Sequence, residues 1–154
     1  MKSIIYKRNI TTMTFLTIIT IVIAIALLKK NIINVANIIE LGTDFQYNIM
    51  NFSGVLAGFL FAGIGILISS IDRKRIKRLW DYHYLDNMYY SAAGGIFACI
   101  INIVVALFLI CGKVNMIVIK WVVMLEIMLI LLSMAYFGYC TIRLFKLISK
   151  LKEE

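Results

Sequence analysis

Proline is absent from this chain of 154 residues, and only 16% of the residues are charged. An average protein contains about 5% proline and about 25% charged residues. The apolar set accounts for 62% of the chain, and the mean hydropathy is +0.94. This composition excludes an ordinary water-soluble domain and predicts an all-α membrane protein with several membrane-spanning helices.

Residues that carry chemistry are also scarce. His83 is the only histidine, which excludes metal sites built on several imidazoles. The cysteines Cys99, Cys111 and Cys140 are far apart and lie in or at the end of apolar stretches, as expected of small apolar fillers. The sequence has no nucleophile-plus-base pair, no glycine-rich phosphate loop and no metal-ligand spacing. We therefore expect no enzymatic activity, no cofactor and no metal.

Four apolar stretches remain when the chain is divided at its charges, each with the roughly 20 residues that a helix needs to cross the bilayer. The predicted spans are residues 10–28, 48–71, 88–111 and 115–141. The first also contains Ala24-Ile25-Ala26, a pattern typical of signal-peptide cleavage. We favour a span there, because the apolar run is longer than a usual signal core and Lys29-Lys30 follow it as a stop.

Basic residues are distributed unevenly between the two sides of the membrane. If the chain crosses four times, twelve lie on the side of the N-terminus and four on the other side. Cytoplasmic loops carry the excess of Lys and Arg, so both termini are predicted in the cytoplasm and the protein in a bacterial inner membrane. Topology then explains most of the net charge of +8, and no nucleic-acid partner is required.

The outer segment of residues 29–43 is predicted to lie in the membrane interface. Polar residues recur there every three positions among aliphatic ones, namely Asn31, Asn34, Asn37 and Glu40. This pattern is typical of a short interfacial helix. Gly42 is expected to end that helix. Thr43 and Gln46 are expected to form a capping box at the start of the second span.

Two spans carry faces of small residues at helical spacing. They are Gly54, Gly58, Ala62, Gly65 and Ser69 in the second span, and Ser91, Gly95, Ala98, Asn102 and Ala106 in the third. Small residues let membrane helices approach closely. One interpretation is packing of these two helices within one subunit. The other is a subunit interface or a pore lining, because a monomer of four helices needs few such faces.

Glu126 is the only acidic residue within a predicted span. It lies about twelve residues, or roughly 18 Å, from the outer end of the fourth helix, close to the bilayer midplane. A carboxyl group there must be protonated, hydrogen-bonded or hydrated, and Asn102 and Thr17 are candidate partners at similar depth. The residue predicts either an ion or proton pathway or a structural hydrogen bond between helices.

Three other charged residues lie near the outer side. Lys120 is expected to extend to the surface rather than pair with Glu126, because residues six apart on one helix do not face each other. Glu40 and Asp44 are expected to raise the cation concentration at an outer mouth, as charged rings do in cation channels.

The inner hairpin of residues 72–87 combines basic and aromatic side chains. They are Arg73, Lys74, Arg75, Lys77, Arg78, Trp80, Tyr82 and Tyr84. One interpretation is positive-inside topology with attraction to anionic lipids and an aromatic belt. The other is a cytoplasmic site for a protein or an oligonucleotide, since basic groups beside stackable rings bind single strands. On the same side, residues 142–154 are expected to form a basic amphipathic extension of the last span.

The size, the four spans, the inner Arg73-Lys74-Arg75 cluster and the glycine-rich second span together resemble the small four-pass membrane proteins of bacterial antiphage defence systems. The channel-forming effector of Hailong systems and the membrane component of Kiwa systems are two such classes. The resemblance covers the architecture of the whole chain. It implies a homo-oligomer, with a tetramer favoured, that is gated or restrained by a cytoplasmic partner or nucleotide-type ligand.

Two hypotheses about function follow. The first is an oligomeric inner-membrane channel or pore-type effector, in which the small-residue faces assemble subunits and the basic inner surface senses a ligand or partner. The alternative is a non-conducting sensor or scaffold that recruits a soluble defence partner through the same inner surface. A bacteriocin immunity protein or a small transporter subunit is less favoured than either.

Overall fold

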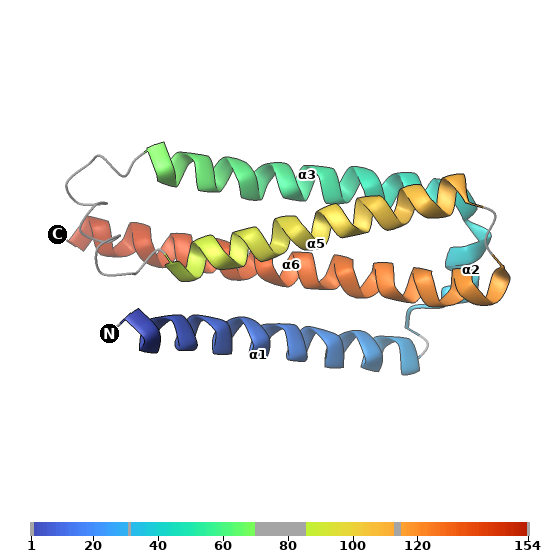
Figure 1. The fold of residues 1–154 in the computed structure, drawn as a ribbon, viewed down its shortest axis with the longest axis horizontal. Helices are drawn as coiled ribbons and strands as arrows, with labels where there is room; N and C mark the ends of the chain where they lie inside the picture. The colour runs from blue at the N-terminus through green and yellow to red at the C-terminus, as the bar shows by residue number, and fades with distance from the viewer. Residues whose placement is uncertain (1, 31, 70–85, 113–114, 154) are drawn as a thin grey trace.

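The computed structural model describes residues 2–30, 32–69, 86–112 and 115–153, which contain helices and no strand. The helices are α1 (Lys2–Lys29), α2 (Val35–Glu40), α3 (Gly42–Ser69), α5 (Asp86–Cys111) and α6 (Met116–Glu153). The four long helices lie side by side, with both termini at one end of the bundle and α2 at the other (Figure 1). We call these the terminal end and the α2 end.

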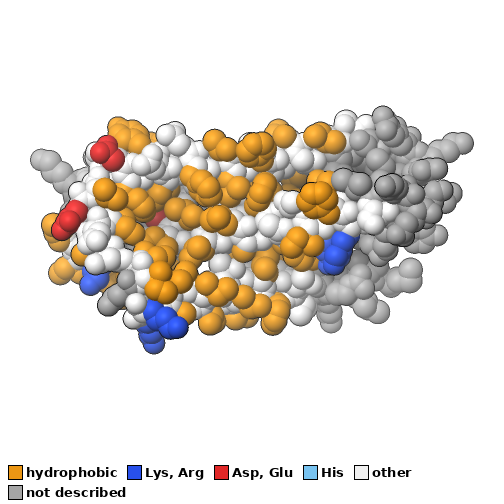
Figure 2. Space-filling view, turned by 180° about the vertical axis from the view of Figure 1, so that it is seen from behind, with side chains coloured by type: hydrophobic (Ala, Val, Ile, Leu, Met, Phe, Trp, Pro, Cys, Tyr) orange, Lys and Arg blue, Asp and Glu red, His pale blue; other side chains and the backbone are white. Residues whose placement is uncertain are grey.

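Each long helix contains a stretch that is long and apolar enough to cross a membrane, as four membrane spans require. The stretches are Thr11–Lys29, Gly42–Ile66, Met88–Cys111 and Met116–Lys146. No proline interrupts them, so the helical hydrogen bonds that lipid requires run without a break. Apolar side chains such as Phe15, Phe97 and Trp121 consequently face outward, and such side chains extend along much of the described surface (Figure 2).

Helix α5 packs along both α3 and α6, while α1 packs mainly along α6. The helices approach closely at Gly95 of α5, where an added Cβ would lie 2.7 Å from Leu60 Cδ1 and 3.2 Å from Tyr136 Cβ. Toward the terminal end, Leu60 packs in an apolar cluster with Met88, Ala92 and Cys140. The bundle is therefore tightly closed on this side of its centre.

The junction between α2 and α3 differs in part from the prediction. The predicted segment does contain a helix, α2, which is short because Asn34 caps it from outside by accepting the Ala36 N–H at 3.0 Å; its place in the membrane interface stays a prediction. Gly42 has a φ of +57°, as expected of a glycine that ends a helix. The predicted capping box is wrong, since Thr43 lies within α3 and the Gln46 amide bonds to Glu126.

Two basic segments are predicted on the side of the termini, residues 142–154 and residues 72–87, and the structure describes most of the first but little of the second. Helix α6 continues to Glu153, so the predicted extension of the last span is helical. Within it, Arg143 Nη2 donates to Tyr139 Oη at 2.7 Å. The inner hairpin of residues 72–87 lies outside the described residues except for its last two positions, which begin α5. Its basic and aromatic candidates, from Arg73 to Tyr84, all fall in the part that is not described.

Candidate functional site

The carboxyl group of Glu126 is the centre of the candidate site. Its side chain is 0% exposed, and no other charged side chain is buried among the described residues. Gln46 Nε2 donates a hydrogen bond to Glu126 Oε2 over 3.0 Å. Glu126 Oε1 is buried as well, with no hydrogen-bond partner in the described part of the chain. Among the described residues, one oxygen of the carboxyl group thus accepts a hydrogen bond and the other accepts none.

Helical spacing places Glu126 in the middle of three layers that run across α3, α5 and α6. Each layer takes one residue from each helix, and successive layers are seven residues apart. The α2-end layer is Gln46, Leu109 and Ile119, the middle layer is Ser53, Asn102 and Glu126, and the terminal-end layer is Leu60, Gly95 and Ser133. Seven residues are about two helical turns, or roughly 10 Å. The residues that surround Glu126 therefore recur every seven positions along each of the three helices.

Contacts within the layers support this register. At the α2 end, Gln46, Leu109 and Ile119 line one cavity. In the middle layer, Asn102 Nδ2 donates to Ser53 Oγ at 3.3 Å. In the terminal-end layer, the backbone oxygen of Ser133 lies 4.0 Å from the position of a Cβ on Gly95. Polar groups thus occupy the first two layers, and close packing at Gly95 follows them.

The partners that we expected for Glu126 need correction. Its hydrogen bond goes to Gln46, whereas Asn102 bonds to Ser53. Thr17 bonds instead to Tyr136 Oη at 2.9 Å, because α1 lies against α6 on another side of the bundle. Sequence spacing assigns Asn102 to the same layer as Glu126, and their similar depth in a membrane stays a prediction.

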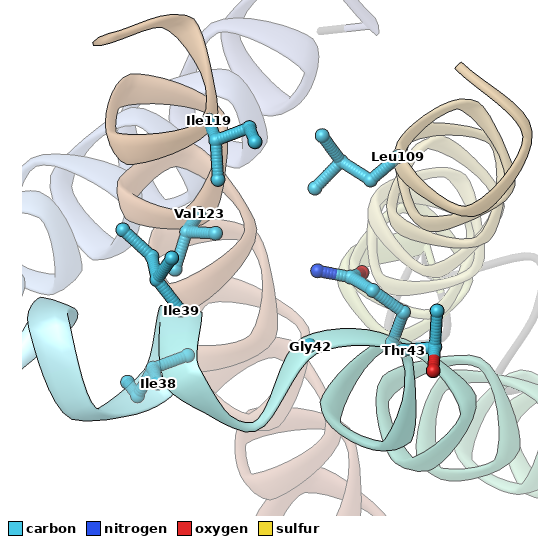
Figure 3. Close-up of a pocket in the computed structure, with 8 residues that line it drawn as sticks. Ile38, Ile39, Gly42, Thr43, Leu109, Ile119 and Val123 are labelled. Atoms are coloured by element: carbon cyan, nitrogen blue, oxygen red, sulfur yellow. The ribbon is translucent and has the colours of Figure 1, made fainter. Parts of the chain in front are cut away.

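A cavity of about 150 Å³ lies at the α2 end of the bundle. Ile38 and Ile39 of α2, the Gly42–Thr43 turn, Leu109, Ile119 and Val123 surround it (Figure 3). Gln46 also lines it and is the residue that contacts Glu126. A single amide side chain therefore connects the cavity to the buried carboxyl group.

The other charged candidates lie at the surface. Glu40 ends α2, Asp44 lies in the first turn of α3, and both are exposed, at the α2 end where acidic side chains are visible (Figure 2). Lys120 is exposed and lines a separate cavity of about 330 Å³ with residues of α2 such as Val35. Among the described residues no ion pair joins Lys120 to Glu126, as its six-residue offset predicts.

The two small-residue faces do not pack against each other. The five residues of the α5 face, Ser91 to Ala106, are all buried. The five residues of the α3 face, Gly54 to Ser69, are all exposed, and a Cβ added at Gly54, Gly58 or Gly65 would meet nothing within 4 Å. The interpretation in which both faces close one intramolecular interface is therefore wrong for α3, which packs through its opposite side.

Two residues of the site were not identified as such from the sequence. The local sequence pattern predicts a helix-cap role for Gln46 and indicates no role for Ser53. The available signal was their seven-residue spacing on one face of the second span, matched by Glu126 and Ser133 in the fourth. Polar residues inside a membrane usually face the bundle interior, so this spacing identifies the inward side of α3.

The architecture defines a multi-pass membrane protein with four helices long and apolar enough to span a bilayer. No family model, curated protein or solved structure gives a significant match to the chain. The features of the bundle that bear on function are therefore the buried polar residues around Glu126.

Proposed function

We propose that the protein is an oligomeric ion-conducting membrane protein and that Glu126 lies on the ion path. The observation that supports this most directly is a fully buried carboxyl group with one unpartnered oxygen, next to a residue that lines a cavity. A charged residue inside a membrane costs several kcal/mol on most scales and commonly marks an ion or proton pathway.

A purely structural role explains less of the geometry. Helix pairs in membranes are joined well enough by uncharged polar groups, as Asn102 and Ser53 join α5 to α3. A carboxyl group adds the ability to bind and release a proton or cation. Its second oxygen contributes nothing to the contact between α3 and α6, since only Oε2 accepts from Gln46. An ion that visits Glu126 would use that oxygen.

The path that we propose starts at the α2 end. Exposed Glu40 and Asp44 lie there and would concentrate cations at the mouth. The cavity lined by Gln46 follows, and then Glu126. Beyond the middle layer, close contact between Leu60 and Gly95 blocks passage, so the described conformation corresponds to a closed state. Opening requires that α3 and α5 separate at this layer.

The subunit arrangement and the setting belong to the same proposal. The exposed small-residue face of α3 gives a second subunit a surface for close approach, and we favour a tetramer. We place the termini in the cytoplasm of a bacterial cell, where a ligand or partner bound by the basic residues among positions 73–78 would restrain the channel, so that the purified protein alone is free to open. Antiphage defence, proposed on the architectural resemblance, is the setting in which controlled ion leakage would act as an effector.

The test is ion flux through the protein reconstituted in liposomes. We expect flux from the wild type and at least a tenfold loss in Glu126→Gln, which keeps the shape and removes the charge. Asp44→Asn is the matched control, because it removes a carboxylate at the surface and would lower flux by about twofold or less. Native mass spectrometry of each sample checks assembly. A wild type without flux, or a clean monomer, contradicts the channel, and unchanged flux in Glu126→Gln removes Glu126 from the path.

A further inference from the structure

We infer that Glu126, with the amide oxygens of Gln46 and Asn102, forms a binding site for one hard monovalent cation. This inference rests on the proposed function, because it names the kind of ion that would stop at Glu126 on the path. It is carried by a separate observation, however, which is the pattern of partnered and unpartnered atoms inside the bundle.

Three side-chain oxygens in the bundle interior are buried and have no hydrogen-bond partner among the described residues. They are Gln46 Oε1, Asn102 Oδ1 and Glu126 Oε1. The nitrogen atoms of the two amides are already engaged, with Glu126 Oε2 and with Ser53 Oγ respectively. Buried polar atoms normally have partners, and three orphan acceptors with no orphan donor beside them suit a positively charged ligand.

The amide of Gln46 is held in this orientation by the carboxyl group. If its oxygen and nitrogen were exchanged, Oε1 would lie 3.0 Å from Glu126 Oε2, which would place two acceptors together when the carboxyl group is ionised. Glu126 therefore fixes Nε2 toward itself and leaves the amide oxygen free. The geometry that holds the carboxyl group is also the geometry that adds an oxygen ligand beside it.

The charge and chemistry of the site select the ligand class. All the free atoms are carboxyl or amide oxygens, which suit hard cations rather than soft transition metals. Glu126 supplies one negative charge and is the only charged side chain buried among the described residues. A divalent ion would leave a net positive charge in an apolar interior, which is costly. A single monovalent ion, for which sodium is the probe, leaves the site neutral.

A proton on Glu126 is the competing ligand, and the geometry disfavours it. A protonated carboxyl group provides one O–H donor, which satisfies one of the other two orphan oxygens at most. A cation is bound by several oxygens at once. It also has a route, because Gln46 both lines the cavity at the α2 end and contacts Glu126.

Equilibrium binding of radioactive sodium to the purified protein in detergent, at alkaline pH, tests the inference. We expect saturable binding of one sodium per chain, lost in Glu126→Gln and at least tenfold weaker in Asn102→Ala. Asp44→Asn is the matched control and would keep the wild-type affinity. Wild type that binds no sodium saturably, or Glu126→Gln that binds it as well as wild type does, overturns the site.

A measurement on the unmodified protein guards against variants that do not fold. Ligands that bind only the folded state raise its stability, so sodium chloride is expected to raise the thermal unfolding midpoint above that in choline chloride at equal ionic strength. An equal midpoint in both salts overturns the inference. Sodium binding without flux in liposomes would sink the proposed channel and keep the site, whereas flux without sodium binding would keep the channel and sink the site.

Discussion

Helices α3 and α5 carry nearly the same pattern of small residues and use it in opposite ways. Gly58 and Ala62 lie on the exposed side of α3, while Gly95 and Ala98 lie on the buried side of α5. The bulky residues are arranged accordingly, since Leu60 of α3 points into the bundle and Phe97 of α5 points out of it. A face of small residues thus permits close packing but does not determine which helix packs against it.

The polar residues on each helix account for the difference. In lipid, apolar surface gives little drive to bury one helix face rather than another, whereas a polar side chain must find a partner inside the bundle. Gln46 and Ser53 lie on α3 opposite its small residues and turn that side inward. Asn102 of α5 is itself part of the small-residue face and turns that face inward.

The largest expected effect comes from the same substitution on the two faces. Ala98→Leu adds three carbon atoms at a position that is 4% exposed, and overpacking there should lower the free energy of unfolding by about 3 kcal/mol. Ala62→Leu adds them at an exposed position of α3 and should change the stability of the subunit by about 0.5 kcal/mol or less. Denaturant titration in mixed micelles measures both. Equal losses of stability would contradict the assignment of the α5 face as buried and the α3 face as exposed.

A second effect, on assembly, concerns the exposed face of α3 alone. If a second subunit packs there, Ala62→Leu should weaken self-association at least tenfold, or by about 1.4 kcal/mol, because a branched side chain keeps the backbones apart. Ala93→Leu is the matched control, since Ala93 is an exposed alanine of α5 outside the small-residue face. Native mass spectrometry over a dilution series reports the association. A loss of the same size in Ala93→Leu would assign the effect to bulk rather than to the α3 face.

The sequence was sufficient for most of the fold. The four spans and the helical extension of the last one follow from runs of apolar residues, an absence of proline and the spacing of charges. The start of α3 was less predictable, because Thr43 and Gln46 fit a capping box locally. A tertiary contact determines the outcome, since Gln46 instead bonds to a carboxyl group 80 residues away.

Half of the candidate site was predictable. Glu126 and Asn102 stand out because polar residues within apolar spans are conspicuous, and their similar depth follows from counting residues. Their partners depend on the rotation of each helix about its axis. That rotation places Thr17 against Tyr136 rather than Glu126, and in α1 no sequence pattern predicts it. The seven-residue spacing of Gln46 and Ser53 contained this information for α3.

The smallest expected effect is the loss of stability when one serine hydroxyl group is removed from each side of α3. Ser53 is 0% exposed and accepts the hydrogen bond from Asn102, so Ser53→Ala leaves Nδ2 unpaired and should cost about 0.6 kcal/mol, an average value for such bonds in membranes. Ser69 is exposed and donates to the backbone oxygen of Ile66 in its own helix, so Ser69→Ala should cost less than about 0.3 kcal/mol. Unfolding in mixed micelles measures both variants. If Ser69→Ala proved the more harmful, the orientation assigned to α3 would be reversed, and with it the argument that polar residues decide which face turns inward.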